Sequence, residues 1–417
     1  MDLPVSQERL REDIERNAEF GAVDVPEGRG RTVRTGSDAD RRTRDYLVER
    51  LEDAGLDVRV DAVGNVAGRW SPPGTGDAAP VAAGSHLDSV PEGGIFDGPL
   101  GVYAALEAVR AMRDADVSPE RPVDVVSFTE EEGGRFASGL LGSSVAAGRR
   151  GVEDAFELRD GEGVALGDAL DGIGYRGDGR LDAAAWDAWL ELHVEQSERL
   201  EDAGVPVGVV TTITGITHCE VTVAGEANHA GSTPMGDRTD ALAAASEFVL
   251  DAERAAMGRV AADSPAAVGT VGSLDVSPNA TNVVPGRVEM GLDVRDVDAA
   301  SMDAVVDRAE ESLARLERER GVETALSRPF DLTPTPMDDR CREALRGTGD
   351  DAGIETLDMH SGAAHDTMHV AEVTDAGMLF APSRDGISHN PLEWTDWADC
   401  AAATTVLAGA LARLAGD

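Results

Sequence analysis

The chain has 417 residues, with 79 Asp and Glu, 37 Arg, no Lys and a formal net charge of −42. Such an acidic surface repels phosphate and anionic lipid, and no run of about 18 apolar residues occurs, so neither a nucleic-acid partner nor a membrane is expected. Hydrophobic residues make up 41% of the chain, enough for the cores of two or three domains.

The first two hundred residues predict alternating helices and strands. Residues 38–54 have helical spacing and stop at Gly55, and a short strand follows at 57–60. Further strands are predicted at 81–84, 123–128 and 189–194, with a loop at 71–76 and a helix at 101–113. This alternation is typical of an α/β domain with a largely parallel sheet.

The middle of the chain has a different pattern. Strand-rich segments are predicted at 207–224 and 266–295, with helices at about 238–257 and 299–318. The α/β pattern then resumes with a strand at 375–380 and a closing helix at 395–414. We therefore predict one discontinuous α/β domain over 1–209 and 329–417, interrupted by an inserted α+β domain over 210–328.

Histidines and carboxylates follow several of the predicted strands. His86 and His193 end two strands, His389 follows the last one, and Asp97 lies in a Gly-rich turn after His86. Because α/β sheets place ligands at the carboxyl ends of their strands, we expect these side chains to meet. Asp88, two residues after His86, is expected to hold the imidazole tautomer.

The strand at 123–128 runs directly into Thr129-Glu-Glu-Glu-Gly133. Three consecutive carboxylates at the end of an apolar strand are costly unless a positive charge compensates them. A metal ion supplies that charge and can leave one Glu free as a base. Together with three His and an Asp, the sequence predicts a metal site, and a two-metal hydrolytic site in particular.

Seven segments, in order along nearly the whole chain, carry a family resemblance. They are GSHLDSVPEGGIFDGPLGV (84–102), EEGGRF (131–136), HVEQ (193–196), VAGEANHAGSTPM (223–235), PNATNVVPGRVEMGLDVR (278–295), SGAAHD (361–366) and PSRDGISHNPLEW (382–394). They resemble the hydantoinase/carbamoylase branch of the M20 metallopeptidase-like amidohydrolases. The resemblance implies a two-part metallopeptidase-like catalytic domain and an inserted dimerisation, or lid, domain.

The resemblance also implies two divalent ions per subunit, which zinc, manganese, cobalt or nickel would satisfy. Asp97 would bridge the ions. His86 and His193 would complete the ligands of one ion, and Glu132 and His389 those of the other.

A general base is implied at Glu131, which would take a proton from the attacking water. The aligned pair of glutamates is the one immediately before Gly133, so Glu130 stands outside it. We expect Glu130 to be a solvated surface acid.

The remaining implied roles concern the substrate and a partner subunit. In a homodimer, His229 of one subunit would reach the other subunit's site and stabilise the oxyanion of the reaction. Arg295 would hold the substrate carboxylate through a bidentate fork, and Asn282 and Gln196 would hydrogen-bond the substrate. Without the resemblance, His229, Asn282 and Gln196 are ordinary loop residues and Arg295 is the partner of a neighbouring Asp.

The expected reaction is hydrolysis of a linear carbon–nitrogen bond in a small ureido or amide acid. An N-carbamoyl-L-amino acid would give the amino acid, ammonia and carbon dioxide, and an allantoate, ureidoglycolate or β-ureidopropionate amidohydrolase is the alternative. An M20 dipeptidase is less expected, because His193 stands where dipeptidases usually carry a carboxylate. A non-catalytic binding protein is least expected, because the base and all ligands are present. Ser197, Thr239 and Ala364 depart from the family's usual residues and leave the substrate open.

Most of the acidity is expected to lie on the surface as an adaptation to a salt-rich cytoplasm, where salt screens the repulsion. GC-rich codon usage would replace Lys with Arg but would not explain the carboxylate excess. The N-terminus lacks the apolar core of a signal peptide, and Cys219, Cys341 and Cys400 do not suggest a disulfide framework. We therefore expect a cytoplasmic enzyme.

Overall fold

The computed structural model describes residues 3–137 and 139–416. The chain divides into two compact units. Unit 1 comprises Met1–Thr211 and Met337–Asp417, and unit 2 comprises Thr212–Pro336. Unit 2 extends past the expected boundary at 328 because the strand β12 (Glu323–Leu332) belongs to its sheet.

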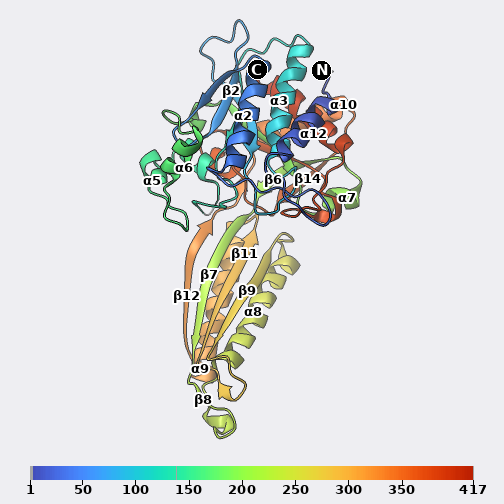
Figure 1. The fold of residues 1–417 in the computed structure, drawn as a ribbon. Coiled ribbons are helices and arrows are strands. Elements are labelled where there is room, and N and C mark those ends of the chain that lie inside the picture. Colours follow the sequence, from blue (N-terminus) through green and yellow to red (C-terminus); the bar gives the residue numbers. More distant parts are fainter. Residues whose placement is uncertain (1–2, 138, 417) are drawn as a thin grey trace. The chain divides into compact units, whose positions relative to one another are not determined.

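Most of a nine-stranded sheet lies in unit 1 (Figure 1). In order along the sheet, the strands are β1 (Asp57–Val60), β2 (Val66–Trp70), β4 (Val123–Phe128), β3 (Val81–His86), β5 (Ala188–Val194), β15 (Asp375–Ala381), β6 (Val207–Ile213) and β13 (Thr335–Pro336), and β14 (Thr356–Ser361) also pairs with β6. The four strands β4, β3, β5 and β15 are mutually parallel, whereas β1, β2 and β6 pair antiparallel. The predicted α/β class with a mainly parallel central sheet is confirmed.

Helices cover the central strands of unit 1, which are buried along their whole length. Every residue of β3, β4 and β5 is buried, as expected for apolar parallel strands covered on both faces. The largest core cluster joins these strands to α1, α3 and α12. The helices of unit 1 are α1 (Gln7–Ala18), α2 (Asp38–Asp53), α3 (Pro99–Asp114), α4 (Leu141–Ala146), α5 (Val152–Phe156), α6 (Leu166–Ile173), α7 (Arg199–Ala203), α10 (Asp339–Ala352), α11 (Thr367–Val370) and α12 (Trp397–Leu414), with short 3₁₀ turns at Ala183–Ala185 and Arg384–Gly386.

Local chemistry explains where two of these helices begin. α2 begins at the predicted Asp38 because the Ser37 hydroxyl accepts the N–H of Asp40 at 3.1 Å and caps the helix. α3 begins at Pro99, earlier than the predicted 101, because a proline in the first turn loses no helical hydrogen bond. The turn before α3 carries Asp97, so the start of α3 fixes the place of that carboxylate.

Unit 2 is an antiparallel sheet of four strands with two long helices (Figure 1). The strand order is β12, β7 (Gly215–Ala224), β11 (Arg287–Asp296) and β9 (Val268–Ser277), and the helices are α8 (Ala241–Ala262) and α9 (Ala299–Arg320). Alternate residues of β7 and β11 enter a core that includes Phe248 of α8 and Leu313 of α9. A two-stranded ribbon of β8 (Asn228–His229) and β10 (Val283–Val284) extends from one end of the sheet, followed by a 3₁₀ turn at Met235–Asp237.

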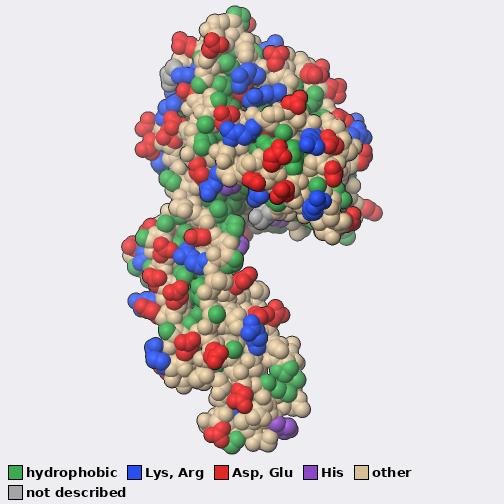
Figure 2. All heavy atoms as spheres, turned by 90° about the vertical axis from the view of Figure 1, so that its left-hand side faces the viewer, with side chains coloured by type: hydrophobic (Ala, Val, Ile, Leu, Met, Phe, Trp, Pro, Cys, Tyr) green, Lys and Arg blue, Asp and Glu red, His purple; other side chains and the backbone are tan. Residues whose placement is uncertain are grey.

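On the face that Figure 2 shows, acidic side chains are spread over both units and are interspersed with Arg. The three cysteines are buried and free. Within residues 3–137 and 139–416, no helix combines the length and apolar character needed to cross a bilayer.

Candidate metal centre

Two neighbouring strands bring two histidines to one edge of the unit 1 sheet. His86 is the last residue of β3, and His193 is the second-last residue of the parallel strand β5. Their Nε2 atoms lie 3.4 and 3.3 Å from the same oxygen, Oδ1 of Asp97. Both imidazoles are 1% exposed, and their rings are stacked with centroids 5.8 Å apart.

The ring nitrogens of these histidines are arranged for a cation. The Nδ1 atoms lie 3.2 Å from the Asp88 carbonyl and 3.0 Å from the Val194 carbonyl, which favours a proton on Nδ1. The Nε2 atoms are buried and have no hydrogen-bond partner among the described residues. Two buried ring nitrogens that face one carboxylate oxygen need positive charge between them. A divalent ion supplies that charge. In the ion-free protein the nearby carboxylates raise the pKa of His86 and of His193, against the effect of burial, so the rings themselves can carry it.

A second group of ligands shares the same Asp. Nε2 of His389 lies 3.5 Å from Oδ2 of Asp97 and 3.4 Å from Oε2 of Glu132. Oε2 of Glu131 lies 3.7 Å from Nε2 of His86. Three overlapping groups could therefore each hold an ion: His86 with Asp97 and His193, His86 with Glu131 and Glu132, and Asp97 with Glu132 and His389. Asp97 joins the first group to the last through its two oxygens.

Asp88 supports both the histidine and the glutamates. Its carboxylate accepts the backbone N–H of Glu131 at 3.2 Å and of Glu132 at 3.1 Å. Oδ1 of Asp88 also lies 3.6 Å from Nδ1 of His86. Asp88 thus holds the end of β3 and the loop after β4 in a fixed relation.

Glu130 does not behave as expected, because it is a buried structural group and not a solvated acid. The residue has a positive φ of 57° and is 1% exposed. Its carboxylate turns back to accept the N–H groups of Arg135 and Phe136. These bonds fold the loop that presents Glu131 and Glu132.

Three non-glycine residues at this centre have left-handed backbone. Glu130, Gln196 and His389 have φ angles of 57°, 62° and 53°, although none of them is glycine. Such conformations are costly for residues with a Cβ and cluster at functional sites. The strain supports the view that this edge of the sheet is the working part of unit 1.

The carboxylates have strongly perturbed pKa values. Burial and the nearby Asp97 raise the pKa of Glu132 to about 8. Burial also raises the pKa of Glu131 well above its ordinary value. Burial opposes ionisation of Asp97 as well, but the imidazoles of His193 and His86 hold its pKa well below the ordinary value. Without a bound cation the centre must therefore retain protons to limit repulsion among its acids.

Two supporting residues were missed by the sequence analysis. Arg31 is fully buried, and its guanidinium donates to the carbonyls of Gly94 and Asp88 at 3.1 and 3.2 Å. Glu393 is 2% exposed, and its Oε1 accepts the N–H of Asp97 at 3.0 Å. Both residues hold the turn that carries Asp97. Glu393 lies inside the matched segment 382–394, whereas no pattern in the sequence singles out Arg31.

Gln196 also lies at this centre, and its side-chain amide donates to Asp97, one of the proposed metal ligands. Its Nε2 donates to Oδ2 of Asp97 at 3.0 Å and to Oγ of Ser388 at 3.1 Å. Its backbone N–H donates to Oγ of Ser383 at 3.0 Å. The amide nitrogen of Gln196, a residue expected to hydrogen-bond the substrate, is therefore already engaged within unit 1.

The structure brings two of the candidate residues of unit 2 together on the β8–β10 ribbon. His229 pairs with Val283, and the N–H of Ala230 donates to the carbonyl of Asn282 at 2.9 Å. Nδ1 of His229 accepts the N–H groups of Gly231 and Ser232 at 3.0 and 3.2 Å. Nε2 of this exposed imidazole must then carry the proton, so the ring is set to donate a hydrogen bond outward.

Arg295 lies at the other end of the unit 2 sheet. It pairs with Ile216 near the start of β7, whereas the ribbon leaves the sheet next to Arg287 at the opposite end of β11. Eight residues of strand correspond to about 27 Å. The Arg295 guanidinium also contacts Asp293, with Nε 3.0 Å from Oδ1.

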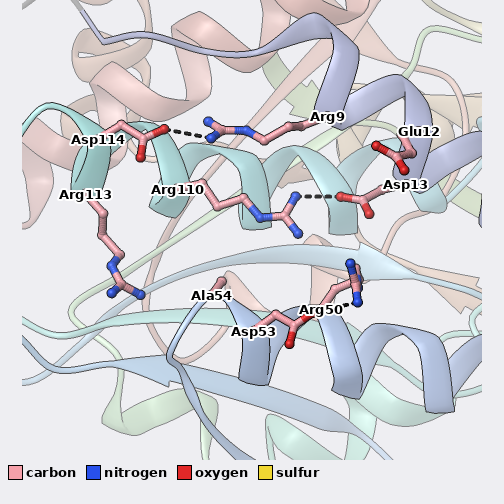
Figure 3. Close-up of a pocket in the computed structure, with 9 residues that line it drawn as sticks. All are labelled: Arg9, Glu12, Asp13, Arg50, Asp53, Ala54, Arg110, Arg113 and Asp114. Atoms are coloured by element: carbon pink, nitrogen blue, oxygen red, sulfur yellow. Dashed lines mark hydrogen bonds and ion pairs between the residues drawn. The ribbon is translucent and has the colours of Figure 1, made fainter.

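A pocket at the far end of α3 offers no comparable chemistry (Figure 3). Three of its four arginines are bound to its acids: Arg9 to Asp114 at 2.7 Å, Arg110 to Asp13 at 2.6 Å, and Arg50 to Asp53 at 2.6 Å. Asp97 precedes the first turn of α3, whereas the first residue of α3 that lines the pocket is Arg110, 11 positions after Pro99 or about 17 Å along the helix. We interpret this pocket as a surface network of ion pairs.

Comparison with known proteins gives consistent matches. The profile of peptidase family M20/M25/M40 matches residues 82–413. An N-carbamoyl-L-amino acid amidohydrolase of Geobacillus stearothermophilus is 40% identical over 399 residues, covering 94% of this chain and 95% of the relative. An allantoate amidohydrolase of Bacillus subtilis is 35% identical, covering 83% of each chain. The crystal structure of a hydantoinase/carbamoylase family amidase from Burkholderia multivorans is 37% identical with a TM-score of 0.93, covering 99% of this chain and 98% of that one. The resemblance inferred from the sequence segments is thereby confirmed.

Proposed function

Because this chain belongs to peptidase family M20/M25/M40, we propose that it is a metal-dependent hydrolase of linear carbon–nitrogen bonds in small ureido or amide acids. The observation that carries the proposal is the pair of orphaned Nε2 atoms of His86 and His193 facing Asp97. Buried nitrogens that face a carboxylate without a hydrogen bond favour a bound cation between them.

Two divalent ions per subunit fit the arrangement of ligands. His86, His193 and Oδ1 of Asp97 would hold one, and Glu132, His389 and Oδ2 of Asp97 the other. Bound divalent ions supply Lewis acidity, which polarises a carbonyl and activates water at neutral pH. Nitrogen and carboxylate ligands suit zinc, manganese, cobalt or nickel.

Glu131 is the proposed general base. Its carboxylate reaches into the ligand cluster beside His86, and burial raises its pKa, which makes it a stronger base than an exposed Glu. Glu131 would take a proton from the attacking water and return it to the leaving nitrogen. Neighbouring Asp88 keeps its backbone in place.

An N-carbamoyl-L-amino acid is the proposed substrate, with the amino acid, ammonia and carbon dioxide as products. Relatives named for this activity support the proposal, and a relative named for allantoate makes an allantoate-type substrate the second candidate. The test is ammonia release by metal-reconstituted protein in molar KCl from N-carbamoyl-L-amino acids, β-ureidopropionate, allantoate and dipeptides. Turnover should be fastest with an N-carbamoyl-L-amino acid. A preference for allantoate would move the assignment to the second candidate, and a preference for dipeptides would contradict both.

The chain is further proposed to act as a homodimer in which His229 and Asn282 serve the partner's site. Arg295 and His229 lie at opposite ends of one sheet, too far apart to hold one small substrate within a single copy of unit 2. If both contact the same substrate, they must come from different chains. Arg295 would bind the substrate carboxylate, and His229 would donate from Nε2 to the developing oxyanion.

Unit 2 also presents an apolar surface that suits such a dimer. Among the described residues, six of the seven exposed large hydrophobic side chains lie in unit 2: Met235, Leu250, Met257, Val260, Val268 and Leu274. Three of them lie on α8 and two on β9, which is an edge strand of the sheet. Edge strands and exposed apolar patches are common sites of self-association.

The dimer is tested by the mass of the protein in solution. Met257→Glu places a charge within the exposed surface of α8 and should convert a dimer to a monomer in light scattering. Ala314→Glu places the same charge on an exposed position of α9 and should leave the dimer intact. A monomeric wild-type protein would contradict the proposal.

A cytoplasmic location and a salt-rich environment complete the proposal. Three buried free thiols fit a reducing compartment. The net charge of −42 fits a protein whose repulsion is screened by concentrated salt.

A further inference from the structure

The Oδ2 atom of Asp97 has more neighbours than it has lone pairs. It accepts from Nε2 of Gln196 at 3.0 Å and from Oγ of Ser388 at 2.9 Å, and it also faces Nε2 of His389 at 3.5 Å. A carboxylate oxygen has two lone pairs, and two donors occupy both. One donor must therefore leave before this oxygen can bind a cation. Oδ1, in contrast, accepts no hydrogen bond from the described residues and faces only the two buried histidines.

Of these two donors, the Ser388 hydroxyl is the one with a second carboxylate in reach among the described residues. Oγ of Ser388 lies 3.0 Å from Oε2 of Glu393, so its hydroxyl lies between two carboxylates. A hydroxyl has a single proton and can donate to only one of them at a time. Gln196 has no such choice, because its two amide protons are directed at Asp97 and at Ser388 itself.

Glu393 is well placed to receive that proton. Its other oxygen, Oε1, accepts the backbone N–H groups of Phe96 and Asp97 at 3.1 and 3.0 Å, so the carboxylate is fixed in orientation. The side chain is 2% exposed, so water does not compete for Oε2. Gly94 packs directly against it, and a Cβ at that position would lie 2.2 Å from Oε1.

We propose that the Ser388 hydroxyl is a two-position donor that turns from Asp97 to Glu393 when Oδ2 of Asp97 binds a divalent ion. We call the ion proposed to lie between Oδ2 of Asp97, Glu132 and His389 the outer ion, and the ion on Oδ1 the inner ion. Glu393 is then a positioning residue for the outer ion, because it accepts the hydrogen bond that Asp97 gives up. Gln196 keeps Asp97 oriented in both states, so its amide nitrogen serves the metal centre and not the substrate. This inference rests on the proposed metal site.

The amide variant Glu393→Gln should hold the Ser388 hydroxyl in one of its two positions, the one that donates to Asp97. Its oxygen must stay on the two backbone N–H groups, so its new NH₂ group faces Ser388 and donates to it. Ser388 would then accept from two amides and keep its own proton on Asp97. The outer ion should bind about tenfold or more weakly, as expected when a hydrogen bond to a charged group must be broken. The inner ion, on Oδ1, should change much less.

Ser388→Ala supplies the matched test, because it removes the donor altogether. The single variant should bind the outer ion at least as tightly as the wild type. In the double variant Ser388→Ala with Glu393→Gln, the affinity lost in Glu393→Gln should return. A merely structural role for Glu393 would leave the double variant as weak as the single one, or weaker.

The measurement is calorimetric titration of the metal-free protein with Mn²⁺, with melting curves as a check of folding. Failure of the wild type to bind Mn²⁺ at all would overturn the metal site and this inference with it. Two bound ions in the wild type with unchanged outer affinity in Glu393→Gln would overturn this inference alone. Weakened outer binding in Ser388→Ala would also overturn it, and that variant decides the matter if Glu393→Gln does not fold.

Discussion

The proposed functional residues of the two units are arranged differently. In unit 1, the proposed ligands come from four separate segments of one chain, yet their atoms lie within contact distance and mostly out of solvent. In unit 2, His229 is exposed and Arg295 lies at the far end of the same sheet. An ion site needs preassembled and desolvated ligands, whereas a substrate contact can be completed by a second surface.

This difference separates the expected effects of mutations. Changes in unit 1 should alter ion binding or the chemical step within a single chain. Changes in unit 2 should leave the ions in place and alter turnover or substrate affinity. The following experiments test that division.

Removal of the proposed base should have the largest effect. Glu131→Gln should lower kcat by about 10³-fold, within the range typical of general bases, while both ions remain bound because the amide keeps the side chain's shape. The test is to measure metal content and steady-state kinetics on the same preparation of the variant. Glu153→Gln, an exposed change on α5, is the control and should behave as the wild type. Residual kcat within tenfold of the wild type would remove Glu131 from that role.

Arg295→Lys tests the substrate contact of unit 2. An ammonium cannot reproduce the planar fork of a guanidinium, so KM should rise about tenfold or more with metal content unchanged. Arg287→Lys is a close control, because Arg287 lies on the same strand and also pairs with an acid two residues away, Glu289. Equal kinetic effects in the two variants would remove Arg295 from the proposed substrate contact.

Parts of this arrangement follow from the sequence, and the reasons are local. β1 and β4 have the predicted bounds because each is a short apolar or alternating run between turn residues. His86 and His193 could be placed because each ends a strand, and parallel strand ends share one edge.

The supporting residues could not be predicted because they act over long separations. Arg31 contacts the carbonyl of a residue 57 positions away, and Glu393 contacts the N–H of one 296 positions away. Glu130 was wrongly expected at the surface because its backbone has a positive φ, which turns the side chain back onto its own loop. The opposite ends occupied by His229 and Arg295 depend on the antiparallel register of unit 2.

Ion binding should depend on pH, because the ligands hold protons in the ion-free protein. Burial beside Asp97 raises the pKa of Glu132 to about 8, so an ion must displace that proton at pH 6. Affinity should rise by up to about tenfold per pH unit between pH 6 and 8. Titrations in two buffers of different ionisation enthalpy would count the released protons, and Glu132→Gln should flatten the slope.

The stability of the ion-free protein should fall as pH rises, whereas its affinity for ions should increase. The folded pKa of Glu132 exceeds its ordinary value of 4.5, so the folded protein holds more protons than the unfolded chain between about pH 4.5 and 8. Its free energy of unfolding should therefore fall as pH rises through that window. A melting temperature that rises with pH over the same window would contradict the assignment.

Salt should raise the melting temperature through many small effects, because exposed carboxylates lie on the surfaces of both units. At about 1 M salt the Debye length is roughly 3 Å, so repulsion among exposed carboxylates is largely screened. The melting temperature should rise steadily in KCl, and amide replacements of exposed acids such as Glu310 and Glu311 on α9 should reduce that rise. Equal stability in dilute buffer and molar KCl would contradict adaptation to salt.

The division between the two units is tested most directly by the activity of a mixed dimer. Glu131→Gln disables the base of unit 1, and His229→Ala removes the proposed donor of unit 2 while leaving an exposed site little changed. If His229 serves the partner, a purified heterodimer of the two variants contains one intact site and should recover about half of the wild-type activity, although each homodimer is nearly inactive. If His229 serves its own chain, both sites of the heterodimer are defective, and the absence of recovery would contradict the account.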